Sequence, residues 1–309
     1  MRLIITGGLG HIGTGILSKI QIFDIFKEII VIDKSVIEKI NHIFNYKSRF
    51  KVKILDENII DFKLEKILKK NDIVIHLAAI TNATESFFNK KKIFQNNFLS
   101  TKKVVEACKK KSSKCIFVST TSIYGSKDKI MYEDNLKNIR PQSPYASCKL
   151  KEEKYILKSF KSKKYKDKFI ILRLGTIFGV SSGMRFHTVV NKFCYQATLN
   201  KPLTIWKTAY HQRRPYLDLN DAINCFSFII KNNKFNNQIC NVVTNNLSIK
   251  ELVKKIKKFK KINIRFVNSK IMNQLSYDVS CKKILSYGFI FRGNLEKQIK
   301  STFKIIKGT

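Results

Sequence analysis

The chain has 309 residues, of which 44% are hydrophobic, so it is long and apolar enough for one large domain or two linked ones. No apolar run approaches the ~20 residues of a membrane-spanning helix, and an apolar strand already begins at Leu3, so we expect no membrane span and no signal peptide. The seven cysteines are scattered without a C-x-x-C pair, which predicts free thiols in a reducing cytoplasm and argues against a disulfide framework or a zinc site.

The positive charge is the most unusual property of the composition. Lys and Arg number 60 against 22 acidic residues, giving a formal net charge of +38. A basic stripe would indicate nucleic-acid binding, because it releases counterions from a phosphate backbone. The lysines are instead spread along the whole chain, without a long basic tail or a basic-aromatic repeat. Together with the abundance of Asn, Ile and Phe, this distribution is typical of compositional bias, and we expect no nucleic acid as the main partner.

The first predicted elements form a dinucleotide-binding motif. Leu3-Ile4-Ile5 predicts a strand, and the next residues, Thr6-Gly-Gly-Leu-Gly-His-Ile-Gly13, carry glycines in the spacing G-x-x-G-x-x-G. Such glycines permit a tight turn, a close approach of backbone to a pyrophosphate and close packing of the following helix. A second strand over 28–32 ends at Asp33, whose carboxylate can accept hydrogen bonds from ribose hydroxyls and would repel a 2′-phosphate. The motif therefore predicts NAD, rather than NADP, as the cofactor.

Further strands alternate with helices up to about residue 180. They are predicted over 51–55, 72–77, 115–118 and 169–174, with a helix over 96–110. Nearly continuous apolar strands separated by helices indicate a parallel sheet covered on both faces. The predicted fold is α/β, a doubly wound parallel sheet of the Rossmann type over residues 1–175, followed by a smaller C-terminal substrate-binding portion over 176–309. Residues 211–231 are expected to return to the Rossmann domain.

Tyr145 and Lys149 are the strongest candidates for chemistry. They are four residues apart, so in a helix both lie on one face and the ammonium sits beside the phenol. Because a neighbouring positive charge favours phenolate, we expect Lys149 to lower the pKa of Tyr145 towards neutrality and to make it a base for a sugar hydroxyl. Thr120 follows a predicted strand, at the edge of the sheet where ligands of parallel sheets bind.

These motifs together give the chain a family resemblance over nearly its whole length. It resembles the extended short-chain dehydrogenases/reductases, in particular their NAD-dependent nucleotide-sugar epimerase/dehydratase group. The matching pieces, in chain order, are Thr6 to Gly13, Asp33, Asp56, His76-Leu-Ala-Ala79, Asn97, Ser119-Thr-Thr-Ser-Ile-Tyr-Gly125, Pro144-Tyr-Ala-Ser-Cys-Lys149, Arg173, Arg214-Pro-Tyr-Leu-Asp-Leu-Asn-Asp221 and Asn241-Val242.

The resemblance implies roles for individual residues. The catalytic residues would be Thr120, Tyr145 and Lys149, whereas His76 is expected to hydrogen-bond locally. Cofactor binding is implied for Gly7, Gly10, His11, Ile12, Gly13, Asp33, Asp56, Leu77, Ala78, Ala79 and Asn97, together with Tyr145 and Lys149; Asp56 would hold the adenine amino group. Substrate binding is implied for Thr120, Thr176, Arg185, Asn191 and Arg214, the last as a clamp on a diphosphate. By the same analogy, the helices around 97–111 and 147–160 would form a homodimer.

Departures from the family pattern narrow the predicted reaction. Family dehydratases place an Asp-Glu pair straight after the catalytic threonine, but here Thr121 and Ser122 stand there and cannot supply the acid and base of an elimination. The 3,5-epimerase/reductase branch expects a cysteine in this loop, and none is present. Thr176 stands where the family has an asparagine that contacts the nucleotide, which leaves the identity of the nucleotide open.

Three hypotheses follow. The favoured one is a nucleotide-sugar 4-epimerase, in which Tyr145 deprotonates the 4-hydroxyl and NAD accepts a hydride, then returns it to the other face of a 4-keto sugar. The second is a related sugar-nucleotide reductase or decarboxylase, which would consume NAD(H) or release CO₂. The third is a non-enzymatic relative that senses NAD or binds RNA, against which the presence of Thr120, Tyr145 and Lys149 argues.

Overall fold

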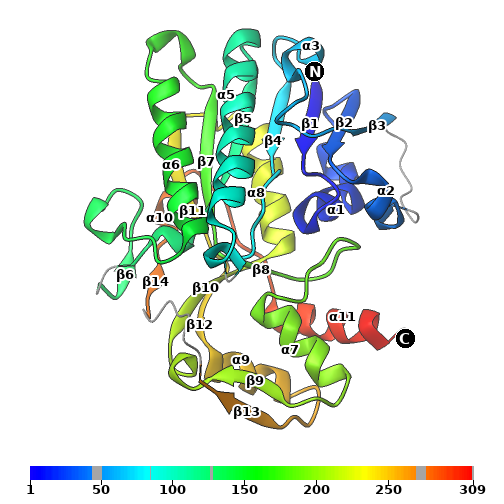
Figure 1. Cartoon of the computed structure of the whole chain (residues 1–309), viewed down its shortest axis with the longest axis vertical. Coiled ribbons are helices and arrows are strands. Elements are labelled where there is room, and N and C mark those ends of the chain that lie inside the picture. Colours follow the sequence, from blue (N-terminus) through cyan, green and yellow to red (C-terminus); the bar gives the residue numbers. More distant parts are fainter. Residues whose placement is uncertain (44–50, 84, 126–127, 269–275, 308–309) are drawn as a thin grey trace.

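The computed structural model describes residues 1–43, 51–83, 85–125, 128–268 and 276–307. Within these residues, seven parallel strands form one large sheet in the order β11-β7-β5-β4-β1-β2-β3 (Figure 1). The strands are β1 (Arg2–Thr6), β2 (Glu28–Asp33), β3 (Lys51–Asp56), β4 (Ile73–His76), β5 (Lys114–Thr120), β7 (Phe169–Leu174) and β11 (Gln238–Val242). The chain runs outward from β1 to β3 on one side and from β4 to β11 on the other. The switch point, where ligands of such sheets bind, therefore lies between β1 and β4.

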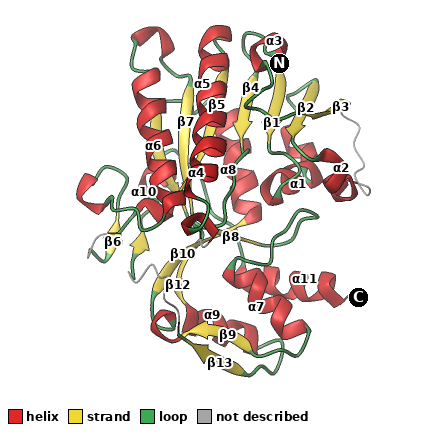
Figure 2. Ribbon diagram, viewed as in Figure 1, coloured by secondary structure: helices red, strands yellow, loops and turns green. Residues whose placement is uncertain are grey.

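Helices cover both faces of this sheet (Figure 2). The alternation of side chains along a strand separates two cores, because Leu3 and Ile5 of β1 point to one face and Ile4 to the other. The first core includes residues of α1 (His11–Ser18), α8 (Leu219–Lys231) and α10 (Lys282–Ser286), and the second those of α3 (Leu64–Ile67), α5 (Leu99–Lys111) and α6 (Pro144–Ser159).

A smaller body lies below the carboxyl ends of the large sheet in Figure 1. Its core joins residues of α7 (Val189–Thr198), α9 (Ile249–Lys257), α11 (Leu295–Lys307) and β9 (Leu203–Trp206), which pairs with β13 (Ile264–Val267). A three-stranded sheet of β8 (Thr176–Phe178), β10 (Arg213–Asp218) and β12 (Asn245–Ser248) links the two bodies. No helix in the described ranges is long and apolar enough to cross a membrane.

The predicted α/β fold with a doubly wound parallel sheet is confirmed, and all six predicted strands are present. The seventh strand, β11, was not predicted as a strand. The helix expected over 96–110 is present but starts earlier, because α4 (Lys90–Ile93) leads through a π-helical turn over Phe94–Phe98 directly into α5. Helix α8 comes from the C-terminal portion of the sequence but packs with α1 in the first core of the large sheet. Its first turn is capped by Asp218, whose side chain accepts from the backbone N–H of Asn220.

Candidate active site

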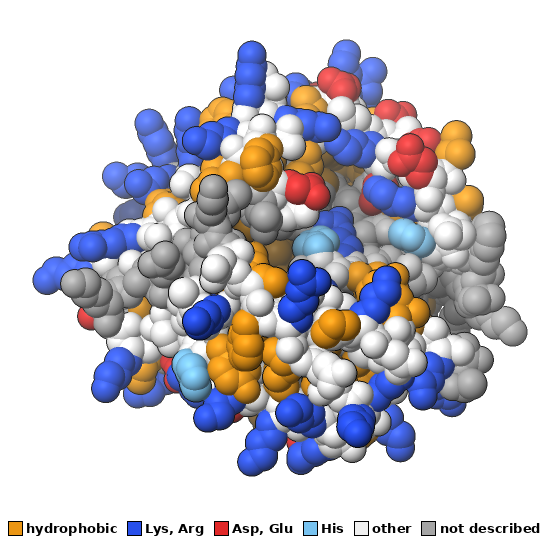
Figure 3. Space-filling view, turned by 60° about the horizontal axis from the view of Figure 1, so that its bottom comes forward, with side chains coloured by type: hydrophobic (Ala, Val, Ile, Leu, Met, Phe, Trp, Pro, Cys, Tyr) orange, Lys and Arg blue, Asp and Glu red, His pale blue; other side chains and the backbone are white. Residues whose placement is uncertain are grey.

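A deep cleft lies between the two bodies. Its volume is about 780 Å³, and it is lined by the carboxyl ends of β1, β2, β4 and β5 on one side and by residues of β8 to β10 on the other. In the space-filling view it opens as a hollow bordered by histidine and basic side chains (Figure 3). β1 and β4 border the switch point of the large sheet, and β2 and β5 are their outer neighbours, so the topology itself places the cleft here.

The glycine-rich turn forms one end of the cleft. Gly7 adopts φ +70°, and a Cβ at this position would lie 2.6 Å from the backbone N of Ala78, so only glycine fits. A Cβ at Gly13 would lie 2.3 Å from the carbonyl O of Gly8. Because glycine has no Cβ, α1 can pack directly on the turn. Gly10 stands at the start of α1, where backbone N–H groups and the helix dipole favour an anion. The turn therefore fits the pyrophosphate of a dinucleotide.

Of the two carboxylates expected at the adenosine end of the cleft, one lines the cleft and the other does not. Asp33 lines the cleft, where its Oδ2 accepts from the backbone N–H of Leu9 at 2.9 Å and its Oδ1 pairs with Lys39 Nζ at 2.6 Å. Asp56 is exposed and lies outside the cleft lining; its Oδ1 accepts from the backbone N–H of Val36. The next residues along the chain, Glu57, Asn58 and Ile59, line the cleft instead.

The middle of the cofactor side is formed by Leu77, Ala78 and Ala79, which all line the cleft. Asn97 is fully buried behind them and does not line it. Its amide binds both backbone groups of Ile80: Oδ1 accepts from Ile80 N at 2.8 Å, and Nδ2 donates to Ile80 O at 2.9 Å. The π-helical turn thus orients Asn97 to fix the loop after β4.

The structure brings Thr120, Tyr145 and Lys149 together. Ser143 caps α6 by accepting from the N–H of Ala146, and Pro144 occupies its first turn, so Tyr145 enters the cleft from the start of a well-defined helix. Lys149 lies one turn further and is 4% exposed; its ammonium donates to the carbonyl of Val118 on β5 at 3.0 Å. Thr120 ends β5, and its Oγ1 accepts from the N–H of Ser122 at 3.1 Å.

The expected net lowering of the tyrosine pKa is wrong for this structure. Burial raises the pKa of Tyr145, and the ammonium of Lys149 opposes that rise without overcoming it. Lys149 itself is buried, which alone would lower its pKa, but the carboxylate of Glu152 and the phenol of Tyr145 outweigh burial and raise it. Glu152, whose Oε2 lies 2.9 Å from Lys149 Nζ, was not predicted as a site residue.

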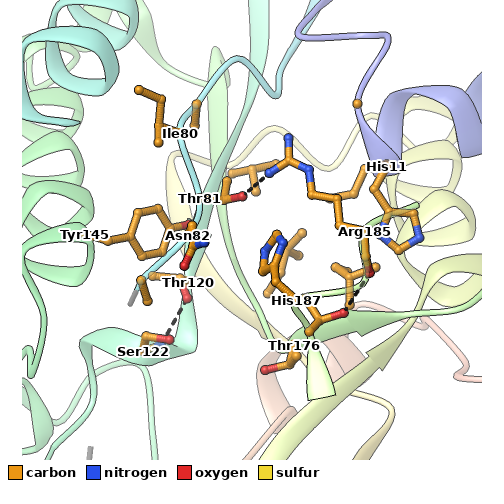
Figure 4. Close-up of a pocket in the computed structure, with 18 of the residues that line it drawn as sticks. His11, Ile80, Thr81, Asn82, Thr120, Ser122, Tyr145, Thr176, Arg185 and His187 are labelled. Carbon is orange, nitrogen blue, oxygen red and sulfur yellow. Dashed lines mark hydrogen bonds between the residues drawn. The ribbon is translucent and has the colours of Figure 1, made fainter. Parts of the chain in front are cut away.

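The residues expected to bind substrate fall into two groups. Thr176, Arg185 and Arg214 line the cleft, whereas Asn191 is buried behind it. Asn191 instead braces the β8–α7 loop (residues 179–188), because its Nδ2 donates to the carbonyl of Arg185 at 3.0 Å. Figure 4 shows Tyr145 and Thr120 on one wall of the cleft and Arg185 on the opposite wall.

The β8–α7 loop docks on the glycine-rich end of the cleft. His11 Nε2 donates to the carbonyl of Gly179 at 2.9 Å. Burial lowers the pKa of His11 to about 4, so the ring is neutral at neutral pH. Gly183 donates its N–H to Thr14 Oγ1 at 3.0 Å. Arg185 Nη1 donates to Thr81 Oγ1 at 2.5 Å, and a Cβ at Gly10 would lie 3.9 Å from its Nη2. Arg185 therefore lies nearer the predicted pyrophosphate than the sugar.

None of the described residues that line the cleft around Tyr145 carries a carboxylate. Among the described lining residues, only Asp33 and Glu57 are acidic. Asp33 ends β2, which is three strand positions from β5 and hence about 14 Å from Thr120 across the sheet. The lining residues that follow Thr120 carry hydroxyls, Thr121 and Ser122, and Figure 4 shows the amide side chain of Asn82 next to Tyr145.

Comparison with known proteins agrees with this geometry. A model described as the NAD dependent epimerase/dehydratase family matches residues 3–242. The dTDP-D-glucose 4,6-dehydratase of Dictyostelium discoideum is 33% identical over 273 residues, which make up 82% of this chain but only 61% of that protein. An uncharacterized UDP-glucose epimerase of Bacillus subtilis is 28% identical over 236 residues, 72% of this chain and 70% of that protein.

Solved structures share the fold over the full chain. The UDP-glucuronic acid 4-epimerase from Bacillus cereus, in complex with UDP-glucuronic acid and NAD, superposes with a TM-score of 0.84 at 24% identity, covering 100% of this chain and 99% of that one. The UDP-N-acetylglucosamine 4-epimerase from Methanobrevibacter ruminantium, in complex with UDP-N-acetylmuramic acid, gives 0.83 at 25% identity with the same coverage. Since the family model matches most of the sequence and the cleft carries its dinucleotide-binding turn, this chain belongs to the NAD-dependent epimerase/dehydratase family.

Proposed function

We propose that this protein is a nucleotide-sugar 4-epimerase that uses bound NAD as a catalyst. The observation that carries the proposal is the composition of the cleft around Tyr145: a phenol beside a buried ammonium, with neutral polar side chains and no carboxylate among the described lining residues there. Removal of water from the sugar needs an acid and a base in addition to the group that takes the hydroxyl proton in the initial oxidation. Oxidation and re-reduction at one carbon needs a single proton-transfer residue, which Tyr145 supplies.

The residues around the reacting carbon have separate roles in this proposal. NAD supplies hydride acceptance and return when it is bound. Tyr145 takes the proton from the sugar 4-hydroxyl and gives it back after the keto sugar has turned over. Thr120 Oγ1 accepts from Ser122 N, so its own proton is available to the same sugar oxygen. Lys149 keeps a positive charge next to the phenol and, by family analogy, would bind the nicotinamide ribose.

The other end of the cleft suits a nucleoside diphosphate. Arg214 lines it, and its guanidinium stacks 5.3 Å from the ring of Tyr277, which holds it in place for a bidentate contact with phosphate oxygens. The two 4-epimerases described above have UDP-sugars in their structures. UDP-hexoses, with and without a carboxyl or N-acetyl group, are therefore the first substrates to test.

The decisive experiment incubates the purified protein with UDP-, dTDP- and GDP-hexoses and follows the configuration at sugar carbon 4 by NMR, for the wild type and Tyr145→Phe. We expect interconversion of C4 epimers without added NAD(H) in the wild type. The variant should lose about 10²-fold or more in kcat, because the proton-transfer group is gone while the ring remains. NAD content of both proteins serves as the control for cofactor binding.

The alternatives predict different products. A 4-keto-6-deoxy sugar would show that the protein is a dehydratase, like several of its relatives. Stoichiometric use of added NADH would identify a reductase, and release of CO₂ a decarboxylase. Equal turnover by the wild type and Tyr145→Phe would contradict the assigned role of Tyr145.

A further inference from the structure

A buried chain of hydrogen bonds connects the glycine-rich turn to Lys149. Thr6 Oγ1 lies 2.7 Å from His76 Nδ1, and His76 Nε2 lies 3.1 Å from Thr101 Oγ1. Thr101 Oγ1 donates to Glu152 Oε2 at 2.8 Å, and Lys149 Nζ donates to the same oxygen at 2.9 Å. All five side chains are buried, so each polar group depends on its neighbour in this chain.

The hydrogen bonds can all point in one direction, towards Glu152. Burial lowers the pKa of His76 to about 3, so its ring is neutral and carries one proton. Because Thr101 gives its proton to Glu152, it accepts from His76 Nε2–H, and Nδ1 then accepts from the Thr6 hydroxyl. Every donor has one acceptor, and the chain ends on a carboxylate. Such an arrangement polarises each bond in the same sense.

Glu152 is surrounded by groups that favour its charged form. Burial keeps the pKa of Glu152 raised, and the adjacent Lys149 ammonium and the donors Thr101 and Cys148 reduce that rise without cancelling it. The Cys148 thiol donates to Oε1 at 3.6 Å. A carboxylate that accepts several hydrogen bonds and pairs with a cation is stabilised in its charged form.

We propose that Glu152 is a positioning residue for the reaction: it fixes the Lys149 ammonium between β5 and Tyr145 and moderates the positive charge that the phenol experiences. The two contacts of Lys149 come from different elements, Val118 O on β5 and Glu152 on its own helix, so together they define one place for the ammonium. This inference deepens the proposed function and rests on it for the kinetic part of its test.

The sign of the effect follows from the groups that face Tyr145. Lys149 and Arg185 lower its pKa, whereas the negative charge of Glu152 raises it. Glu152 also raises the pKa of Lys149. His76, at the end of β4, is neutral, and burial raises the pKa of the Cys148 thiol to about 12, so these two neighbours contribute no charge change near neutral pH. Removing the carboxylate charge must therefore lower the pKa of both Tyr145 and Lys149.

The test uses Glu152→Gln, which keeps the size of the side chain and removes its charge. The phenolate of Tyr145 is titrated by ultraviolet difference absorbance in the full-length protein, with the same variant carrying Tyr145→Phe as the blank. We expect the titration midpoint of Tyr145 to move to lower pH. In the pH profile of kcat, the acidic limb, set by Tyr145, and the alkaline limb, set by Lys149, should both move to lower pH.

Two further variants separate positioning from folding. Glu152→Asp keeps the charge but withdraws the carboxylate by one methylene, so kcat should fall about tenfold or more while the phenolate midpoint moves less than in Glu152→Gln. Glu106→Gln, at an exposed glutamate of α5 paired with Lys102, is the matched control and should change neither quantity. If Glu152→Gln proves unstable, Glu152→Asp and Thr101→Val, which removes one donor to Glu152, carry the test.

Unchanged midpoints and unchanged pH limbs in Glu152→Gln would overturn the proposal, even if kcat fell, because a purely structural role lowers activity without moving them. The phenolate titration needs no substrate. A shifted midpoint in a protein that turns over no nucleotide sugar would therefore support the role of Glu152 while contradicting the epimerase assignment.

Discussion

At the scale of single residues, a buried ion pair behind the cleft holds β7 and α6 together. Arg173 on β7 donates to both carboxylate oxygens of Glu153 on α6, at 3.0 and 2.7 Å, and both side chains are 2% exposed. The remaining guanidinium nitrogen donates to Tyr124 OH at 2.9 Å. Glu153 also accepts from Ser119, the residue before Thr120. The positions of Thr120 and of α6 therefore depend on one satisfied charge pair.

Glu153→Gln should reduce the free energy of unfolding by about 3–5 kcal/mol, because it leaves the Arg173 charge buried without a counter-ion. Urea denaturation followed by circular dichroism measures this loss. Glu106→Gln, which removes an exposed carboxylate 3.9 Å from Lys102, should cost less than about 1 kcal/mol and serves as the control. Equal losses in the two variants would show that the buried pair contributes no more than a surface pair.

Sequence patterns predicted the residues that lie on short, regular motifs, but not those that depend on tertiary contacts. Tyr145 and Lys149 share a helix face, and Asp33 ends a strand, so spacing alone located them in the cleft. Glu152 lies in the run Lys149-Leu-Lys-Glu-Glu-Lys154, which resembles a solvated helix surface. Only the packing of α6 against β5 and α5 turns this carboxylate inward. Asp56 was predicted from the family resemblance, yet its side chain accepts from the N–H of Val36 and lies outside the cleft lining.

At the scale of elements, the β8–α7 loop is the segment most closely fitted to the cofactor end of the cleft. A Cβ at Gly183 would lie 2.9 Å from the backbone C and O of Gly10 and from Thr14 Oγ1. These atoms belong to the glycine-rich turn and to α1, so they have little freedom to move aside. The loop can therefore close on this end of the cleft only with glycine at this position.

Gly183→Ala should displace the loop and weaken NAD binding by about tenfold, which corresponds to the ~1.4 kcal/mol expected of mild overpacking. The affinity is measured by titrating NAD into protein freed of cofactor and following tyrosine and tryptophan fluorescence. Ser182→Ala provides the control, since it removes only the hydroxyl that donates to the carbonyl of His42. An unchanged dissociation constant in Gly183→Ala would mean that the loop does not contribute to cofactor binding.

Two elements that were not predicted from the sequence, β11 and the π-helical turn, have weak sequence patterns. β11, with the sequence Gln238-Ile-Cys-Asn-Val242, is short and interrupted by polar residues, and its strand character comes from pairing with β7. The π-helical turn at Phe94–Phe98 has no distinctive composition, although it sets the direction of the Asn97 side chain. Long apolar strands such as β7 were predicted with accurate bounds because burial on both faces requires a continuous apolar run.

At the scale of the whole molecule, an aromatic surface lies over α6 and the turn before α5. Phe94 and Phe98 stack with their ring centroids 5.1 Å apart, and Phe98 packs edge-on against Tyr155 at 5.5 Å. Lys151 lies over the ring of Phe94 at 4.3 Å. These helices are the ones that family analogy assigns to a homodimer, and a partly exposed aromatic cluster is typical of such interfaces.

Phe98→Glu should convert the predicted homodimer to a monomer, because the interface would bury a carboxylate, whereas in the monomer Lys151 can pair with it. Sedimentation velocity at several protein concentrations measures the change. Leu136→Glu replaces a leucine that is 78% exposed on another part of the molecule and should leave the association state unchanged. A monomeric wild type would remove the basis of this prediction.

The net charge of +38 is distributed rather than focused. Lys and Arg side chains surround the face seen in Figure 3 without merging into one stripe. The expectation that nucleic acid is not the main partner remains a prediction from the sequence.

The pairing of β11 with β7 has a consequence for how the protein is made. β11 lies more than sixty residues beyond the end of β7, yet it supplies the backbone partners of that strand and places Asn241, whose Oδ1 accepts from Tyr124 OH. A nascent chain that has left the ribosome only as far as residue 175 has β7 as an open edge and this hydroxyl without its amide acceptor. Every residue of the proposed catalytic trio is synthesised early, but the sheet beneath it closes only after the smaller body has begun to emerge. We therefore expect the proposed catalytic site to be complete only late in synthesis, after β11 has been made.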